Sequence, residues 1–308
     1  MLPDHEQMMN LKSASLDALQ LKLLAEKNIC ADVLRLDKIH PVISGNKWFK
    51  IKYYLEEAQR ENINTVLTYG GAYSNHIIAA AYAAKTFGLK SIGIIRGNEP
   101  PILSHTLQQA KSFGMQLEFI SRDDYKKRNE ASFQSMLAGK FDDAFIIPEG
   151  GSGANGIKGS AEILSLINSD AYSHILCAVG TGTMFSGLAN VSKPNQKLIG
   201  VCVLKGMHEG YKELVDKSKK MGSYEINHDY HSGGYAKTNS EIIQFMNSFY
   251  EQTGIPTDFV YTAKLFYAAL DLVRKNYFTP QSKLLIIHSG GLQGNASLKP
   301  GTLIFNNE

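Results

Sequence analysis

From about residue 64 onwards, short and continuously apolar segments alternate with segments whose apolar residues recur at helical spacing. The apolar segments cover residues 65–70, 91–97, 116–121, 143–151, 174–182, 197–204 and 283–291, and many of them end in glycine. Between them the spacing predicts helices over residues 74–88, 104–114, 155–168, 207–220, 239–253 and 262–276. Strands that are apolar throughout and separated by helices are typical of a parallel sheet covered on both faces. The pattern therefore predicts an α/β fold.

One more helix is predicted upstream, because apolar residues occupy positions 48, 49, 51, 54 and 55. Asn46 is a good N-cap for this helix, which places Lys47 on its first turn. The helix dipole disfavours a cation at that end, and the penalty falls if the amine is uncharged or carries an anionic group. The alternative is that Lys47 is a solvated charge beside Lys50 and Lys52.

Polar residues gather in the loops that follow the predicted strands, where ligands bind in open α/β sheets. After the strand at 174–179, Gly180, Thr181, Gly182 and Thr183 lead into a helix. Glycines let the backbone approach an anion, and a helix N-terminus offers free N–H groups, so this loop predicts a phosphate site. It is neither a Walker loop nor a dinucleotide fingerprint. A tight turn that needs glycine for its own conformation is the alternative.

A second such loop follows the strand at 65–70, where Ser74, Asn75 and His76 open an alanine-rich helix. Three adjacent hydrogen-bonding side chains at a helix N-terminus suit a carboxylate, although Ser74 is also an ordinary N-cap. Ser289, after the strand that begins near 283, either donates to a ring nitrogen or closes a turn. Tyr261 begins the helix at 262–276, where a capping role is the alternative.

Composition narrows the function classes. The chain has 308 residues, 44% of them apolar and 20% charged, with a net charge of +3, which indicates neither nucleic acid nor a membrane surface as a partner. The first residues are acidic and polar, unlike a signal peptide, and the three widely spaced cysteines suit neither zinc nor disulfides, so a cytoplasmic protein is expected. No metal site is predicted, because His-x-x-x-His does not occur. A serine hydrolase is not supported, because Gly-x-Ser-x-Gly is absent.

A phosphate loop, a carboxylate loop and a lysine with a reason to be neutral together describe a pyridoxal 5'-phosphate enzyme that acts on a small amino acid. Lys47 forms the Schiff base with the cofactor aldehyde, which a low amine pKa favours. A non-enzymatic protein that binds pyridoxal phosphate or a nucleotide is the alternative from a different class.

The same residues resemble the D-cysteine desulfhydrase and 1-aminocyclopropane-1-carboxylate deaminase family. Five segments carry the resemblance, in family order: Ser44-Gly45-Asn46-Lys47 with Phe49-Lys50-Ile51 and Tyr54-Leu55, then 74–76, 180–183, 258–264 and 288–291. The chain departs from the family pattern at Arg35-Leu36-Asp37, where the family has Arg-Asp-Asp, at Phe49, and at Ile78-Ala79.

The resemblance implies a two-domain, fold type II pyridoxal phosphate enzyme with three α/β/α layers and mostly parallel sheets, usually a homodimer. Residues 1–50 and 155–308 are expected to form the larger, cofactor-binding domain, and 51–154 the smaller domain with the carboxylate loop. It implies Lys47 as the Schiff-base lysine, Ser74 as base or positioning hydroxyl, and Asn75 and His76 on the substrate carboxylate or near the ring. Asn75 and 180–183 would hold the cofactor, and Tyr235 and Tyr261 would face the substrate.

Position 262 separates the chemistries. In the deaminases the resemblance implies glutamate there, facing the pyridine nitrogen and keeping it protonated; here it is Thr262, with Ser289 as another neutral partner. A weaker electron sink suits β-elimination, which favours a D-cysteine desulfhydrase that releases sulfide, ammonia and pyruvate. The alternatives are a 1-aminocyclopropane-1-carboxylate deaminase, which gives 2-oxobutanoate, or another type II lyase such as a serine or threonine dehydratase or cysteine synthase.

Overall fold

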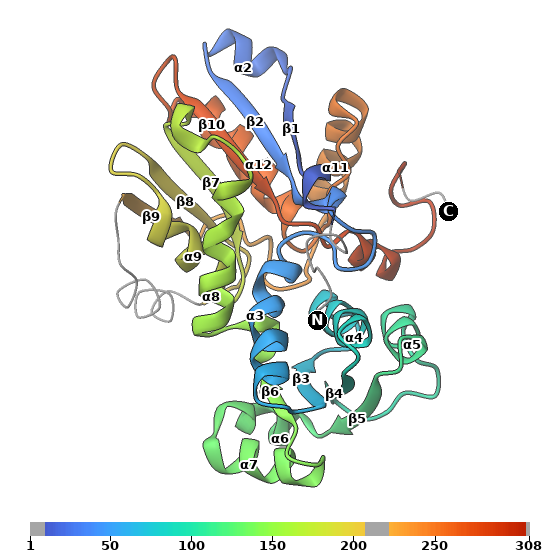
Figure 1. Cartoon of the computed structure of the whole chain (residues 1–308). Helices are drawn as coiled ribbons and strands as arrows, with labels where there is room; N and C mark the ends of the chain where they lie inside the picture. Colours follow the sequence, from blue (N-terminus) through green and yellow to red (C-terminus); the bar gives the residue numbers. More distant parts are fainter. Residues whose placement is uncertain (1–9, 207–221, 306–308) are drawn as a thin grey trace. The chain divides into compact units, whose positions relative to one another are not determined.

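A computed structural model describes residues 10–206 and 222–305 (Figure 1). Backbone contacts divide the chain into two compact units. The smaller unit comprises Lys47–Gly159, and the larger one comprises the described residues 10–46 and 160–305. The chain therefore passes between the units after Asn46 and again after Gly159. The domain boundaries expected from the sequence, at 50/51 and 154/155, stay a prediction.

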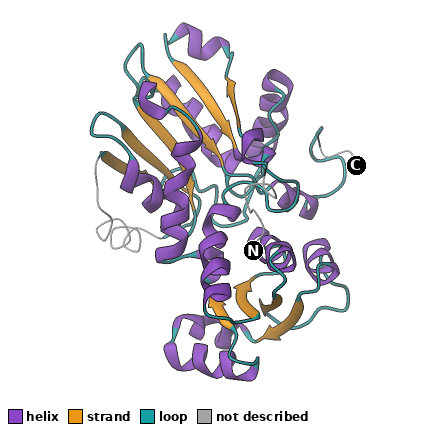
Figure 2. Ribbon diagram, in the orientation of Figure 1, coloured by secondary structure: helices purple, strands orange, loops and turns teal. Residues whose placement is uncertain are grey.

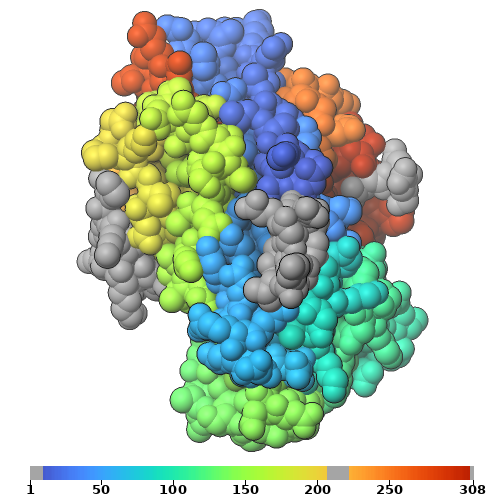
Figure 3. All heavy atoms as spheres, viewed as in Figure 1, coloured from blue at the N-terminus to red at the C-terminus, as the bar shows by residue number. Residues whose placement is uncertain are grey.

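The larger unit contains a six-stranded sheet with the order β1-β2-β10-β7-β8-β9. Its strands are β1 (Ser15–Ala18), β2 (Cys30–Arg35), β7 (His174–Val179), β8 (Lys197–Cys202), β9 (Ser223–Asn227) and β10 (Lys283–His288). All neighbours are parallel except the β1–β2 pair, which is antiparallel. The N-terminal strand β2 therefore pairs with the C-terminal strand β10, and blue and orange-red atoms lie side by side at the top of Figure 3.

Helices pack on both faces of this sheet (Figure 2). They are α2 (Lys22–Glu26), α9 (Thr183–Val191), α11 (Ser240–Thr253) and α12 (Thr262–Arg274), while α8 (Ala154–Ala161) spans the passage between the units. Leu176 of β7 shares a buried cluster with Phe266 of α12. Gly200 lies against α9, because a Cβ there would lie 2.8 Å from the Phe185 ring. Burial on both faces explains why these strands are apolar throughout.

The smaller unit contains a four-stranded parallel sheet with the order β5-β4-β3-β6. Its strands are β3 (Thr65–Gly70), β4 (Lys90–Arg96), β5 (Gln116–Ile120) and β6 (Phe145–Ile147). Its helices are α3 (Lys47–Arg60), α4 (Asn75–Thr86), α5 (His105–Ser112), α6 (Arg122–Lys126) and α7 (Ala131–Lys140). Tyr69 of β3 and Tyr125 of α6 belong to the buried cluster on one face of this sheet.

The predicted α/β fold with mostly parallel sheets is confirmed, and all seven predicted strands are present. The helix predicted over 155–168 is different: α8 ends at Ala161 and a 3₁₀ segment, η5 (Glu162–Leu166), follows. The helix predicted over 207–220 lies outside the described residues. None of the helices in residues 10–206 and 222–305 combines the length and apolar character that crossing a membrane requires. All three cysteines are free thiols.

Candidate active site

The carboxyl ends of β10 and β7 bring two predicted cofactor segments to one edge of the larger sheet. These strands are parallel neighbours, so Ser289 follows one of them and residues 180–183 follow the other. In open α/β sheets, ligands bind at this edge. The topology of the larger unit therefore gathers residues that lie about a hundred positions apart in the sequence.

The turn at 180–183 has the features of an anion site. Gly182 is the N-cap of α9 with φ +80°, a conformation that favours glycine. The hydroxyls of Thr181 and Thr183 lie 2.9 Å apart at the start of this helix. A Cβ at Gly180 would lie 3.0 Å from the ring of Tyr261, so the backbone and this ring are in close contact. The turn presents helix N-terminal N–H groups and hydroxyls, which suit a phosphate.

The segment before Lys47 is fixed to the same sheet edge. Gly45 has φ +71°, and a Cβ there would lie 1.8 Å from the carbonyl oxygen of Ser289, so only glycine fits. The N–H of Asn46 donates to that carbonyl at 3.2 Å. The side-chain nitrogen of Asn46, Nδ2, also lies 3.2 Å from the sulfur of Met184 in α9. The residue that precedes Lys47 in the chain is therefore held by both the β10 and the β7 side.

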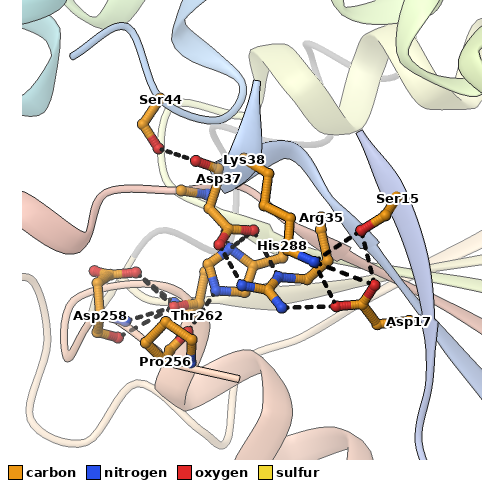
Figure 4. A network of polar contacts seen from close by, with 11 residues as sticks. Ser15, Asp17, Arg35, Asp37, Lys38, Ser44, Pro256, Asp258, Thr262 and His288 are labelled. Carbon is orange, nitrogen blue, oxygen red and sulfur yellow. Dashed lines mark hydrogen bonds and ion pairs between the residues drawn. The ribbon is translucent and has the colours of Figure 1, made fainter. Parts of the chain in front are cut away.

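A network of charged side chains, in which those of Arg35, Asp37 and His288 are buried, supports this segment (Figure 4). Arg35 and His288 end β2 and β10 and are register partners. The Arg35 guanidinium contacts Asp37 through Nε at 2.8 Å and Nη2 at 2.6 Å, and Asp17 through Nη1 at 2.8 Å. Asp37 Oδ1 lies 3.2 Å from Nδ1 of His288, and the Asp37 carbonyl accepts from the Ser44 hydroxyl at 3.4 Å.

This network keeps a carboxylate charged in the interior. Burial alone would raise the pKa of Asp37, but the hydrogen bonds from Arg35 and the neighbouring His288 outweigh it, so the pKa lies below its usual value. The sequence analysis identified Arg35 and Asp37 only as part of a segment that departs from the family pattern, and it predicted no ion pair between them. Their common signal was a charged residue at the end of a buried strand, followed two residues later by its counter-ion.

In the smaller unit, α3 begins at Lys47, as predicted. Lys47 is half-buried, and Lys50, one turn further on, is only 5% exposed. Burial and the charge of Lys47 place the pKa of Lys50 well below its usual value. Lys50 is therefore not a solvated charge, and it is a candidate site residue that the sequence analysis missed. Its helical spacing from Lys47 was the available signal.

Ser74 and Asn75 occupy the N-terminus of α4. The Ser74 hydroxyl oxygen accepts the N–H groups of His76 and Ile77, both at 3.3 Å, so the capping interpretation is confirmed. In the described residues the Ser74 hydroxyl donates no hydrogen bond, so its proton remains available. Asn75 is buried as the first residue of α4.

The hydrogen bonds around His76 assign its tautomer. The Thr68 hydroxyl donates to the carbonyl of Ile147 at 2.8 Å and lies 2.7 Å from Nε2 of His76. A hydroxyl has one proton, and a carbonyl can only accept, so Nε2 of His76 carries hydrogen and donates to Thr68. Nδ1 is then a bare acceptor, buried, and without a hydrogen-bond partner in the described residues.

Electrostatics keep His76 in that state. Burial, and then the charges of Lys47 and Lys50, lower the pKa of His76 to about 3. The ring is therefore neutral at neutral pH. Its only N–H is already donated to Thr68, so the predicted role of the His76 ring in holding a carboxylate does not fit this arrangement.

Asp258 organises the start of α12. One carboxylate oxygen accepts the N–H groups of Val260 and Tyr261 at 2.9 and 3.0 Å. The other accepts the N–H and the hydroxyl of Thr262, both at 2.8 Å. The Thr262 hydroxyl in turn accepts the N–H of Asp258 at 2.7 Å, and both side chains are fully buried. The single hydroxyl proton of Thr262 is therefore already used.

The two predicted tyrosines meet in the larger unit. The rings of Tyr235 and Tyr261 have their centroids 6.1 Å apart at an interplanar angle of 69°. Tyr235 is 47% exposed, so one ring packs near the turn at Gly180 while the other faces solvent. Such edge-to-face pairs combine apolar surface with polar hydroxyl groups.

Residues 17–290 match the family described as pyridoxal-phosphate dependent enzymes. The chain belongs to this family. The predicted cofactor and the prediction of an enzyme are confirmed, and the non-enzymatic alternative is dropped.

Two individual relatives indicate which group within this family the chain resembles. A Thermotoga maritima protein with the provisional name 1-aminocyclopropane-1-carboxylate deaminase is 31% identical over 296 residues, covering 89% of this chain and 93% of the relative. The Arabidopsis thaliana bifunctional D-cysteine desulfhydrase/1-aminocyclopropane-1-carboxylate deaminase, mitochondrial, is 27% identical over 289 residues, covering 82% and 70%. The predicted membership of this deaminase and desulfhydrase family is confirmed.

Solved structures of other proteins share the fold of this chain. A crystal structure of an ACC deaminase homologue has a TM-score of 0.79 at 25% identity and covers 92% of this chain and 90% of that one. Threonine deaminase isoform 2 from Solanum lycopersicum has a TM-score of 0.66 at 16% identity and covers 92% and 82%, which shows a shared fold. The fold is that of a type II pyridoxal phosphate enzyme.

The residues of the larger unit fit pyridoxal phosphate. The turn at 180–183 offers N–H groups and hydroxyls to a phosphate. The hydroxyl of Ser289, at the same edge, has no hydrogen-bond partner in the described residues, and it can serve a ring nitrogen as donor or acceptor. Within residues 10–206 and 222–305, no group of three or more His, Cys, Asp and Glu side chains is arranged to hold a metal ion.

Proposed function

We propose that this enzyme catalyses β-elimination on a small D-amino acid such as D-cysteine, giving pyruvate, ammonia and sulfide. The observation that carries the proposal is at the start of α12. Position 262 is a threonine whose hydroxyl proton is donated to Asp258, and the Asp258 carboxylate is occupied by four hydrogen bonds. No carboxylate at position 262 is available to keep a pyridine nitrogen protonated.

The partner of the ring nitrogen decides how much charge the site can absorb. When bound, pyridoxal phosphate accepts the electron pair released at the substrate α-carbon. A carboxylate beside the nitrogen would strengthen this electron sink, whereas a hydroxyl leaves it weaker. β-Elimination tolerates the weaker sink, because the leaving group departs with an electron pair. We assign the nitrogen to Ser289, because the Thr262 hydroxyl has no proton left to donate.

The remaining residues take positioning and proton-transfer roles. Lys47 Nζ binds the cofactor and moves the substrate α-proton. Ser74 sits at a helix N-terminus, where two N–H groups stabilise charge on its oxygen, which suits a base or a positioning hydroxyl. We assign the substrate carboxylate to Asn75 and the N-terminal end of α4, and leave the His76 ring as an acceptor. Tyr235 and Tyr261 face the amino acid.

The test is the identity of the 2-oxo acid that the purified enzyme releases. D-Cysteine, L-cysteine and 1-aminocyclopropane-1-carboxylate are supplied separately, with Lys47→Ala as the inactive control. Pyruvate and sulfide from D-cysteine, without 2-oxobutanoate from the cyclopropane, are expected. Release of 2-oxobutanoate at a comparable rate would overturn the argument from Thr262.

Cyclopropane deamination is the second candidate, and the Thermotoga relative and the ACC deaminase homologue support it. Under that function, Ser289 or another group would have to hold a proton near the ring nitrogen. A homodimer, which the resemblance implies, is also proposed, and light scattering of the purified enzyme tests it.

A further inference from the structure

The loop that carries Tyr235 has an unusual backbone. Four of its residues have positive φ angles: +48° at Ser232, +90° at Gly233, +117° at Gly234 and +52° at Ala236. Positive φ is uncommon for serine and alanine and persists only where the surroundings hold it in place. Tyr235 lies between two such residues, so its direction depends on what holds the loop.

α12 supplies such a contact through Lys264. Its Nζ donates to the carbonyl oxygen of Gly234 at 2.8 Å, and its side chain is fully buried. Bonds within the loop, from Lys237 N to Gly234 O at 3.2 Å and from Gly234 N to His231 O at 2.9 Å, shape the turn without joining it to another element. Lys264 therefore ties the residue before Tyr235 to α12.

The presence of an ionisable residue at the buried position 264 also requires an explanation. Burial lowers the pKa of Lys264 to about 8, and the neighbouring Asp258 carboxyl and, less strongly, the neighbouring Cys202 oppose that shift. The stem of Lys205 lies on another side of the loop, 3.4 Å from where a Cβ at Gly234 would be. A buried ammonium is costly, and an apolar side chain would avoid the cost. Packing alone therefore does not require lysine here.

The same turn of α12 also begins with the second tyrosine. Tyr261 is fixed through its backbone to Asp258, and its ring pairs with that of Tyr235. We propose that Lys264 is a positioning residue that holds Tyr235 against Tyr261 on the substrate side of the site. This inference rests on the proposed function, in which both tyrosines face the amino acid. The helix α12 would then fix the positions of both tyrosine side chains.

Two variants separate the hydrogen bond from the charge. Lys264→Met keeps much of the volume but donates nothing, whereas Lys264→Gln keeps an N–H donor and cannot titrate. Lys283→Met, which changes an exposed lysine at the start of β10, is the matched control. Backbone hydrogen exchange is measured by mass spectrometry on the full-length protein at one pH. Faster exchange in the peptide around 231–237 is expected for the Met variant and not for the control.

Turnover of D-cysteine supplies the second readout. The Met variant should raise KM about tenfold, the loss expected for one charge-assisted hydrogen bond, with a smaller change in kcat. The Gln variant should recover part of this KM. The wild-type KM should rise as the pH passes about 8, where Lys264 loses its proton, and the Gln variant should lack that rise.

Each outcome decides the inference. Unchanged hydrogen exchange in the Met variant would show that Lys264 does not hold the loop around Tyr235. Faster exchange with an unchanged KM would show that Lys264 has a structural role only. The exchange arm needs no substrate. If the wild-type enzyme turned over no amino acid, the proposed function would fail, and the tie itself would still be judged by exchange.

Discussion

His76 offers a sharp prediction about acid stability. Its pKa is about 3 in the folded protein and about 6.5 in an unfolded chain, because burial and two lysines oppose protonation. As the pH falls below 6.5, the unfolded chain binds a proton at this position and the folded protein does not. The contribution of His76 to the free energy of unfolding is therefore fully present above pH 6.5, and it is lost as the pH falls towards 3. At 1.36 kcal/mol for each pH unit, His76 alone lowers the free energy of unfolding by about 2 kcal/mol between pH 7.5 and 5.0.

His76→Gln removes this titration while keeping an N–H that can donate to Thr68. Urea unfolding is followed through Trp48, the single tryptophan, which is buried in the same unit. The quantity compared is the loss of unfolding free energy between pH 7.5 and 5.0 in each protein, so other titrating groups contribute equally to both. The loss should be about 2 kcal/mol smaller in the variant. Equal losses would refute the assignment of a neutral, buried His76 with a bare Nδ1.

Three further predictions concern the larger unit. Gly45→Ala should abolish retention of pyridoxal phosphate on dialysis, because its Cβ would lie 1.8 Å from the Ser289 carbonyl; full retention would show that this contact is not needed. Thr262→Val should destabilise the protein by about 1–3 kcal/mol in urea unfolding, because a buried carboxylate loses a donor; a change below about 0.5 kcal/mol would contradict the Asp258 network. Asp37→Asn should lower thermal stability by weakening the pair with buried Arg35, and Asp123→Asn, at an exposed ion pair, should not; equal effects would refute the importance of burial.

The sequence predicted the parallel strands well because burial on both faces leaves an unmistakable signature. It predicted the glycine-rich turn before α9 and the cap at Ser74 for the same kind of reason, since glycine at positive φ and a hydroxyl at a helix start are local requirements. The phosphate role of residues 180–183 stays a prediction. The strands β1, β2 and β9 were not predicted. β1 is antiparallel at the edge of its sheet and alternates half-buried and exposed residues over only four positions.

What sequence reasoning missed depends on contacts between distant residues. Lys50 resembles a solvated lysine until the chain folds around it. The tautomer of His76 is set by Thr68 and Ile147, which lie on different strands. Likewise, nothing local to Lys264 indicates that its amine reaches Gly234, thirty residues earlier.

The most direct test of the central claim is to find the lysine that carries the cofactor. The enzyme loaded with pyridoxal phosphate is reduced with borohydride, digested, and analysed by peptide mass spectrometry, with Lys47→Ala and Lys50→Met in parallel. The proposed site predicts a pyridoxyl group on Lys47 in the wild type and in Lys50→Met, and none in Lys47→Ala. A label on Lys50, or one that survives in Lys47→Ala, would contradict it.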